Sequence, residues 1–121
     1  MKFTVERDVL RSALDMASLA LKESDKEPIH THYLVKVGAD SKATLEASNR
    51  FLYCKAGMEV AEGEDGMMTV PGGPLKELAK LADEGPMVFE TSEDETVTIT
   101  SGQARIVFTS LPSGEFLTPS E

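Results

Sequence analysis

The chain has 121 residues, 40% of them hydrophobic and 27% charged, which suits one globular domain and is too short for two. Its formal net charge of −9 argues against a protein that binds nucleic acid over its whole surface, because phosphate binding depends on lysine and arginine. No apolar run nears the roughly 20 residues of a membrane helix, no signal-peptide pattern opens the chain, and the single cysteine excludes an internal disulfide, so we expect a cytoplasmic protein.

The first sixty residues predict a strand, a helix and three more strands. Apolar and polar residues alternate over 2–6, as in a strand. From Arg7 the apolar spacing becomes that of an amphipathic helix, which we expect to end near Leu21. Strands are predicted at 33–37, 43–48 and 51–60, and Cys54 in the last one is expected to be a small buried apolar residue. The expected buried stripe of the helix is Leu10, Ala13, Leu14, Ala17 and Leu21.

The second part of the chain repeats this order. A short strand at 67–71 precedes a helix that begins near Pro74, a residue favoured in the first helical turn. Strands are predicted at 86–91, 96–101 and 103–111. The chain therefore has two β-α-β-β-β halves, 1–60 and 66–111, followed by a linker or tail at 112–121. We predict an α+β fold with two adjacent helices on one face and antiparallel sheets on the other. The expected buried stripe of the second helix is Leu75, Leu78, Ala79 and Ala82.

The charges are divided unequally between the two helical segments and the rest of the chain. Residues 7–26 and 71–82 together carry six basic and five acidic residues, so the remainder carries six basic and sixteen acidic residues. One face can thus be neutral to mildly basic while the other repels polyanions. The basic residues of the two segments are Arg7, Arg11, Lys22, Lys26, Lys76 and Lys80.

Several stretches in register resemble one family. They are the opening MKFTVERDVL, Pro28-Ile29, TVP at 69–71, SGQAR at 101–105 and TSLPSGEF at 109–116. Together they resemble the first domain of the bacterial DNA polymerase III β subunit family, the DNA sliding clamps.

This resemblance implies a DNA-clamp domain, the first of three in a longer chain. Two such chains would close as a homodimer into a ring around double-stranded DNA, with helices lining the hole. The protein would be a non-catalytic processivity factor of DNA replication that tethers the polymerase. DNA polymerase and clamp loader would dock on the two domains that are absent here, and the isolated fragment would be a monomer without a cofactor.

The resemblance also implies roles for single residues. The six basic residues of the helical segments would face the DNA phosphates. The subunit contact would use the second helix and the last strand. The sequence departs from the family pattern at two positions that would face DNA. Ser24 stands where a principal arginine is expected, and Pro74 displaces a lysine. Thr96 and Gln103 stand where further basic partners are expected at the subunit contact. The expected contact residues are Lys76, Leu78, Arg105, Ile106 and Phe108.

Two other interpretations remain open from the sequence. A free-standing acidic module of the same fold could bind a protein partner and no DNA, and a reading frame that stops at Glu121 would favour it. A small enzyme is the remote alternative, although no nucleophile and base stand at a recognisable spacing. His30 and His32 could begin a metal site, but no third ligand accompanies them, so we predict no metal.

Overall fold

The computed structural model describes residues 1–20, 31–38, 40–49, 51–92 and 95–110. These ranges contain eight strands, two α-helices and one short 3₁₀ helix. In chain order the elements are β1 (Lys2–Glu6), α1 (Arg7–Ala17), the 3₁₀ helix η1 (Ser18–Ala20), β2 (His32–Val37), β3 (Lys42–Ser48), β4 (Tyr53–Glu59), β5 (Gly66–Pro71), α2 (Gly72–Leu81), β6 (Pro86–Thr91), β7 (Thr96–Ser101) and β8 (Ala104–Thr109).

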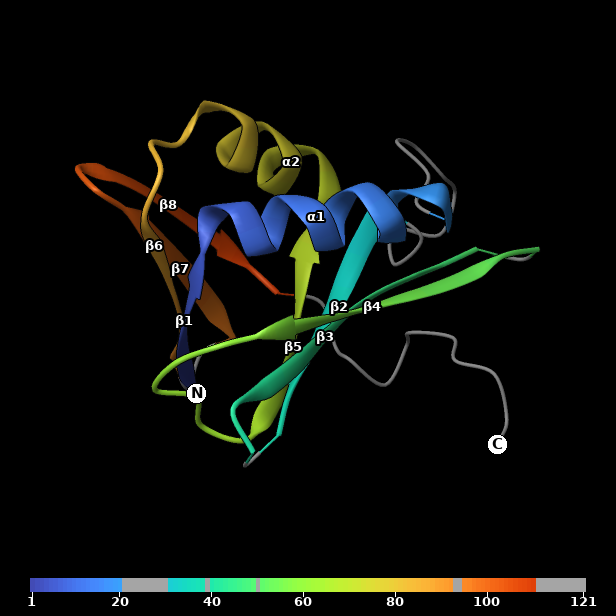
Figure 1. The fold of residues 1–121 in the computed structure, drawn as a ribbon, viewed down its shortest axis with the longest axis horizontal. Coiled ribbons are helices and arrows are strands. Elements are labelled where there is room, and N and C mark those ends of the chain that lie inside the picture. The colour runs from blue at the N-terminus through green and yellow to red at the C-terminus, as the bar shows by residue number, and fades with distance from the viewer. Residues whose placement is uncertain (21–30, 39, 50, 93–94, 111–121) are drawn as a thin grey trace.

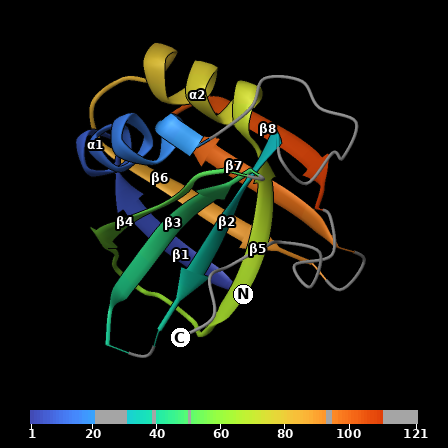
Figure 2. The ribbon, with the colours of Figure 1, turned by 90° about the vertical axis from the view of Figure 1, so that its right-hand side faces the viewer.

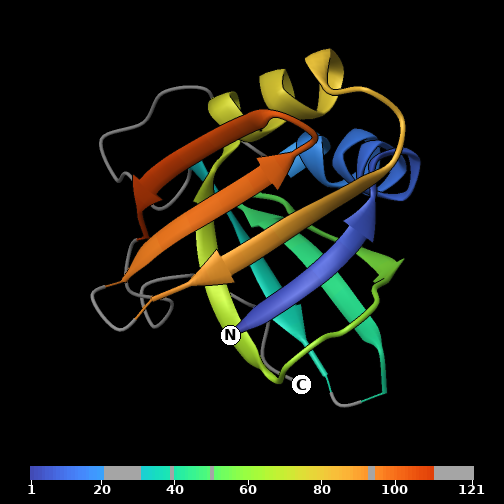
Figure 3. The same cartoon turned by 90° about the vertical axis from the view of Figure 1, so that its left-hand side faces the viewer.

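The strands form two antiparallel sheets of four strands each. Sheet 1 has the order β1-β6-β7-β8, and sheet 2 has the order β4-β3-β2-β5 (Figures 2 and 3). The first strand of each half therefore lies in the sheet of the other half, because β1 pairs with β6 and β5 pairs with β2. This exchange was not predicted. It joins the two halves through main-chain hydrogen bonds as well as through the core.

The core lies between the two sheets and under both helices. Phe3 of β1 and Phe89 of β6 stack with their ring centroids 4.8 Å apart, and both side chains are almost fully buried. Leu10 and Leu14 from α1 and Leu75 from α2 belong to the same buried cluster. The predicted α+β architecture is confirmed, with the repeated element order and with both helices on one face (Figure 1).

The strand exchange fixes the course of the two helices. α1 follows β1 of sheet 1 and precedes β2 of sheet 2, whereas α2 follows β5 of sheet 2 and precedes β6 of sheet 1. Each helix thus crosses between the sheets, in opposite directions, and the two lie side by side (Figure 1). The end of α2 comes next to the start of α1, where the Arg7 amide donates to the Gly85 carbonyl at 2.9 Å.

The helix limits differ from the prediction. α1 ends at Ala17 and passes into η1, where the Ser18 hydroxyl donates to the Leu14 carbonyl at 2.5 Å. Leu21 lies outside the described residues. The other four residues of the predicted α1 stripe are buried. α2 begins at Gly72, two residues before the predicted start, and Ala82 of its predicted stripe is only half-buried because it follows the last helical residue.

The strand prediction was wrong at the start of β4, and β8 is also shorter at both ends than the predicted 103–111. The predicted strand began at Phe51, but the Asn49 side-chain oxygen accepts from the amides of Phe51 and Leu52 at 2.7 and 3.0 Å and holds them in a turn. Cys54 is half-buried rather than buried, since β4 is an edge strand of sheet 2.

Candidate nucleic-acid interface

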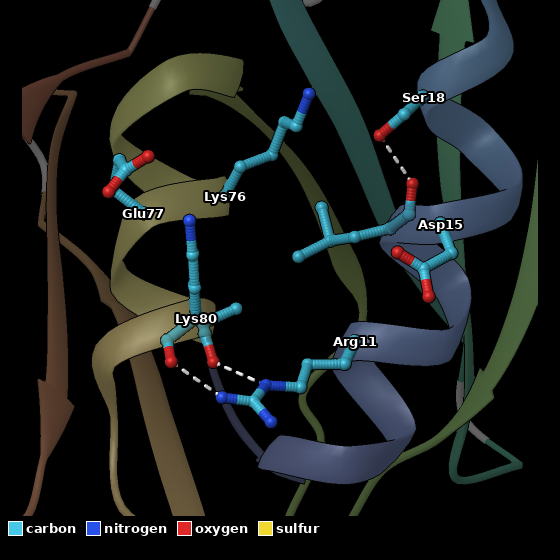
Figure 4. Close-up of a pocket in the computed structure, with 8 residues that line it drawn as sticks. Arg11, Asp15, Ser18, Lys76, Glu77 and Lys80 are labelled. Atoms are coloured by element: carbon cyan, nitrogen blue, oxygen red, sulfur yellow. Dashed lines mark hydrogen bonds between the residues drawn. The ribbon is translucent and has the colours of Figure 1, made fainter.

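A groove of about 410 Å³ lies between the two helices (Figure 4). It is an open hollow on the helical face rather than an enclosed cavity, so its polar side chains are accessible from outside. On each helix, charged residues four apart share one side, and the packing of the two helices turns these sides toward the same hollow. The lining residues are Arg11, Leu14, Asp15, Ser18, Lys76, Glu77, Ala79 and Lys80.

Two lysines of α2 supply most of the positive charge of this groove. Lys76 and Lys80 are one turn apart, and their side chains extend over the space between the helices (Figure 4). Lys80 is exposed and Lys76 is half-buried. Within the described part of the chain, neither ammonium group forms an ion pair. Among the described residues that line the groove, two are carboxylates, Asp15 and Glu77, so its three cations leave it mildly positive.

The two arginines of α1 have carbonyl partners that the sequence did not predict. Arg11 donates from Nε to the Ala79 carbonyl and from Nη2 to the Lys80 carbonyl, both at 2.6 Å (Figure 4). Arg7 donates from Nη1 to the Ala82 carbonyl at 2.8 Å and pairs with the neighbouring Asp8 at 3.0 Å. Arg7 does not line the groove. The structure therefore brings Arg11, Lys76 and Lys80 together and places Arg7 beside them at the end of α2.

The rest of the predicted DNA-binding set lies in the segment after α1. Lys22 and Lys26, like Ser24, are outside the described residues, so their contribution to the helical face stays a prediction. Pro74 is exposed in the first turn of α2, as its position in the sequence suggested.

The predicted subunit contact corresponds to α2 and β8, and β8 is an edge strand of sheet 1. Arg105 is exposed on this edge, but Ile106 and Phe108 are half-buried against the core. Leu78 is only 7% exposed and belongs to the core, so it offers little surface to a partner.

Sequence reasoning missed two exposed apolar residues on these elements. They are Leu81 at the end of α2, which is 76% exposed, and Val107 on β8, which is 53% exposed. Leu81 falls off the helical stripe, and Val107 alternates with the inward-facing residues of the strand. The exposure of both residues could therefore have been predicted from the sequence pattern.

Exposed carboxylates stand both beside the helices and away from them. Asp8 and Asp15 on α1 and Asp83 and Glu84 after α2 belong to the first group. The second group lies on β4, on β6, in the loop between β4 and β5, and before β7. Figure 1 shows the loop between β4 and β5 at the opposite end of the molecule from α2. The exposed residues of the second group are Glu59, Glu62, Glu64, Asp65, Glu90 and Glu95.

Other candidate sites receive little support from the geometry. His32 is half-buried and its Nδ1 lies 3.1 Å from the Thr31 hydroxyl, whereas His30 is outside the described residues. Among the described residues, no three His, Cys, Asp or Glu side chains are grouped so that they could hold a metal ion. Neither described helix has the length and the apolar character needed to cross a bilayer.

Comparisons with known proteins point to one family. The sequence model of the family described as DNA polymerase III beta subunit, N-terminal domain, matches residues 1–119. The beta sliding clamp of Escherichia coli K12 is 29% identical over 117 residues, which cover 96% of this chain and 32% of that protein. The chain thus spans about one third of the length of the curated relatives that it matches.

Solved structures share the fold over the whole chain. The DNA polymerase sliding clamp of Caulobacter crescentus superposes with a TM-score of 0.92 at 24% identity, covering 100% of this chain and 33% of that one. The beta clamp of Helicobacter pylori, solved bound to a DNA ligase peptide, gives a TM-score of 0.91 at 20% identity and covers 100% and 34%. At these identities the likeness shows the fold alone.

Proposed function

The chain belongs to the family of the DNA polymerase III beta subunit, as its N-terminal domain, and from this premise we propose that it is the first domain of a sliding clamp. The full-length protein would be a non-catalytic processivity factor of DNA replication in the bacterial cytoplasm. It would encircle duplex DNA and tether the replicative polymerase to it.

The observation that carries this proposal is the mildly basic groove between two adjacent helices on an otherwise acidic domain. Lys76 and Lys80 extend over the groove without an ion-pair partner in the described residues, and three cations against two carboxylates in its lining leave the groove itself mildly positive. Such a face can approach phosphates, whereas the acidic surfaces repel them. Contacts to phosphates carry no sequence information, so a ring that relies on a few of them can slide along the duplex.

Ring closure would need surfaces beyond this chain. We propose that two further domains follow it and that a second copy completes the ring, since the chain covers only 32% of the E. coli beta sliding clamp. The edge strand β8 can extend its sheet by pairing with a strand of another subunit. Arg105 would pair with a carboxylate there, and Ile106, Phe108 and Lys76 would border the contact. Leu78, being buried, would shape α2 from inside rather than touch the partner.

The partners of the ring would bind mainly outside this domain. The H. pylori beta clamp was solved with a DNA ligase peptide, and we propose that polymerase, clamp loader and similar peptides bind the full-length protein through its later domains. No cofactor or metal enters this function, because holding DNA by closure requires no chemical step. The isolated chain would be a monomer with very weak affinity for DNA, since most of the ring is missing.

Retention on circular DNA tests the proposal. The full-length protein would be loaded onto a nicked circle with its clamp loader and washed in moderate salt. We expect it to stay on the circle and to leave within minutes once a restriction enzyme makes the circle linear. Equal retention on circular and linear DNA would refute encirclement. No retention on either, together with a reading frame that ends at Glu121, would favour the free-standing acidic module instead.

A further inference from the structure

The end of α2 has an unusual cap. The last carbonyls of a helix have no partner within it, and many helices end on a glycine in the left-handed conformation that helps to satisfy them. Here the residue after the helix, Ala82, is extended, with φ −67° and ψ 148°, so that ending is not used. Its amide still reaches the Leu78 carbonyl at 2.8 Å, but the carbonyls of Ala79 and Lys80 are left for side chains.

Arginines from the other helix fill this role. The planar guanidinium of Arg11 bridges two successive carbonyls, those of Ala79 and Lys80, and Arg7 binds the carbonyl of Ala82. Two positive charges thus lie at the negative end of the α2 dipole, which is a favourable arrangement. A guanidinium can donate two bonds in a fixed fork, whereas a lysine ammonium is a point donor and cannot reproduce the bridge. We call these contacts of Arg7 and Arg11 the arginine clasp.

The clasp acts on the part of α2 that carries the groove lysines. Lys80 supplies one of the bridged carbonyls, so the backbone from which its side chain extends is tied to α1. Lys76 lies one turn earlier on the same side of the helix. Fixing the end of α2 therefore sets its rotation and its distance from α1, and with them the positions of both ammonium groups over the groove (Figure 4).

We infer that Arg7 and Arg11 are positioning residues, which hold α2 by its terminal carbonyls so that Lys76 and Lys80 face the DNA, rather than phosphate ligands themselves. This inference rests on the proposed function for its DNA part. Against a ligand role, the Arg7 side chain is only 17% exposed and lies outside the groove, and two nitrogens of Arg11 are already used by carbonyls.

A double-mutant cycle separates positioning from direct contact. Arg11→Lys keeps the charge but cannot bridge the carbonyls, and Arg11→Met removes both. Each would be made in the full-length protein with native lysines and in the Lys76→Met/Lys80→Met background. Equilibrium binding to a short duplex would be measured by fluorescence anisotropy. With native lysines we expect both variants to weaken binding by threefold to tenfold, on the order of couplings between contacting residues. In the Lys76→Met/Lys80→Met background we expect the Arg11 variants to lose almost no further affinity.

Other outcomes would overturn the inference. If Arg11→Lys binds like the parent while Arg11→Met loses affinity in both backgrounds, Arg11 is a phosphate ligand. If both variants unfold at a lower temperature than the parent but bind DNA normally well below that temperature, the clasp is only structural.

Amide hydrogen exchange gives a readout that does not depend on DNA. In Arg11→Lys we expect the Ala82 amide, at the end of α2, to exchange faster by on the order of tenfold, because the turn it closes loses its tie to α1. Lys80→Met should leave this rate unchanged. If the full-length protein binds no DNA but the exchange rates behave in this way, the proposed function fails while the clasp stands. Unchanged exchange in Arg11→Lys refutes the clasp itself.

Discussion

The salt dependence of DNA binding should identify the groove lysines as phosphate contacts. Replacing both Lys76 and Lys80 by methionine removes the two ammonium groups that extend over the groove and keeps most of the length and the helix propensity of the side chains. Both residues are surface-accessible, so the substitution should not disturb the core. We expect weaker binding of the full-length protein to DNA and a shallower salt dependence.

The magnitude follows from how many phosphates the two lysines neutralise. Each phosphate neutralised on duplex DNA contributes about 0.9 to the slope of log K against log salt. Removing one ammonium group from each of two phosphates should therefore reduce the slope by about 1.8. Over a fourfold rise in salt, from about 50 to 200 mM, the affinity of the parent protein should fall by about tenfold more than that of the double variant.

The assay is anisotropy on a short linear duplex at several salt concentrations, because a ring can enter and leave such DNA freely. Lys42→Met/Lys55→Met is the matched control, since both lysines are exposed on sheet 2, away from the groove. An unchanged slope in the groove variant, or an equal change in the control, would contradict the assignment of the helical face to DNA.

Three further predictions concern folding, each measured by urea unfolding. Phe89→Ala should lower the free energy of unfolding by about 3–5 kcal/mol, because it empties a site at the centre of the core, whereas Phe51→Ala, at 83% exposure, should change it by less than about 0.5 kcal/mol. Lys36→Met should lower the free energy of unfolding by about 1–2 kcal/mol, because it removes the ammonium group 3.6 Å from the buried Glu46 carboxylate. The lysine side chain is 43% exposed, and solvent screening therefore limits this decrease. Burial raises the pKa of Tyr33, so the folded protein keeps a proton that the unfolded chain releases above pH of about 10. Stability should therefore fall as pH rises beyond that point, and Tyr33→Phe should remove this part of the pH dependence.

The sequence predicted those parts of the fold that depend on local periodicity. The alternation around Phe3 and the helical spacing from Leu10 are properties of neighbouring residues, and the structure has a strand and a helix there. The exchange of first strands could not be predicted in this way. Phe3 lies opposite Phe89 in the sheet, and nothing in the residues around either one specifies a partner so distant in the chain.

Part of the candidate site could also be predicted, because it depends on local spacing. The four-residue spacing of Lys76 and Lys80 placed them on one side of a helix, and they do share the groove. Arg7 and Arg11 are also four residues apart, but this spacing could not show that both reach the end of the other helix. Hydrogen bonds across 68 to 75 residues depend on how the helices are packed, which local patterns do not contain. Lys22 and Lys26 stay predictions.

The strand exchange, the arginine clasp and the weak charge of the groove follow from one another. Because β1 and β5 change places, α1 and α2 cross between the sheets in opposite directions and lie antiparallel. The end of α2 must then lie beside the start of α1, where Arg7 and Arg11 meet its carbonyls, and the opposed helix dipoles favour this arrangement. With the arginines committed to the helix, only two lysines of the described helical face remain to attract phosphates. Such a face would be inadequate for a protein that holds DNA by affinity. It suits a ring that holds DNA by closure, since each additional phosphate contact would slow sliding without making escape any harder.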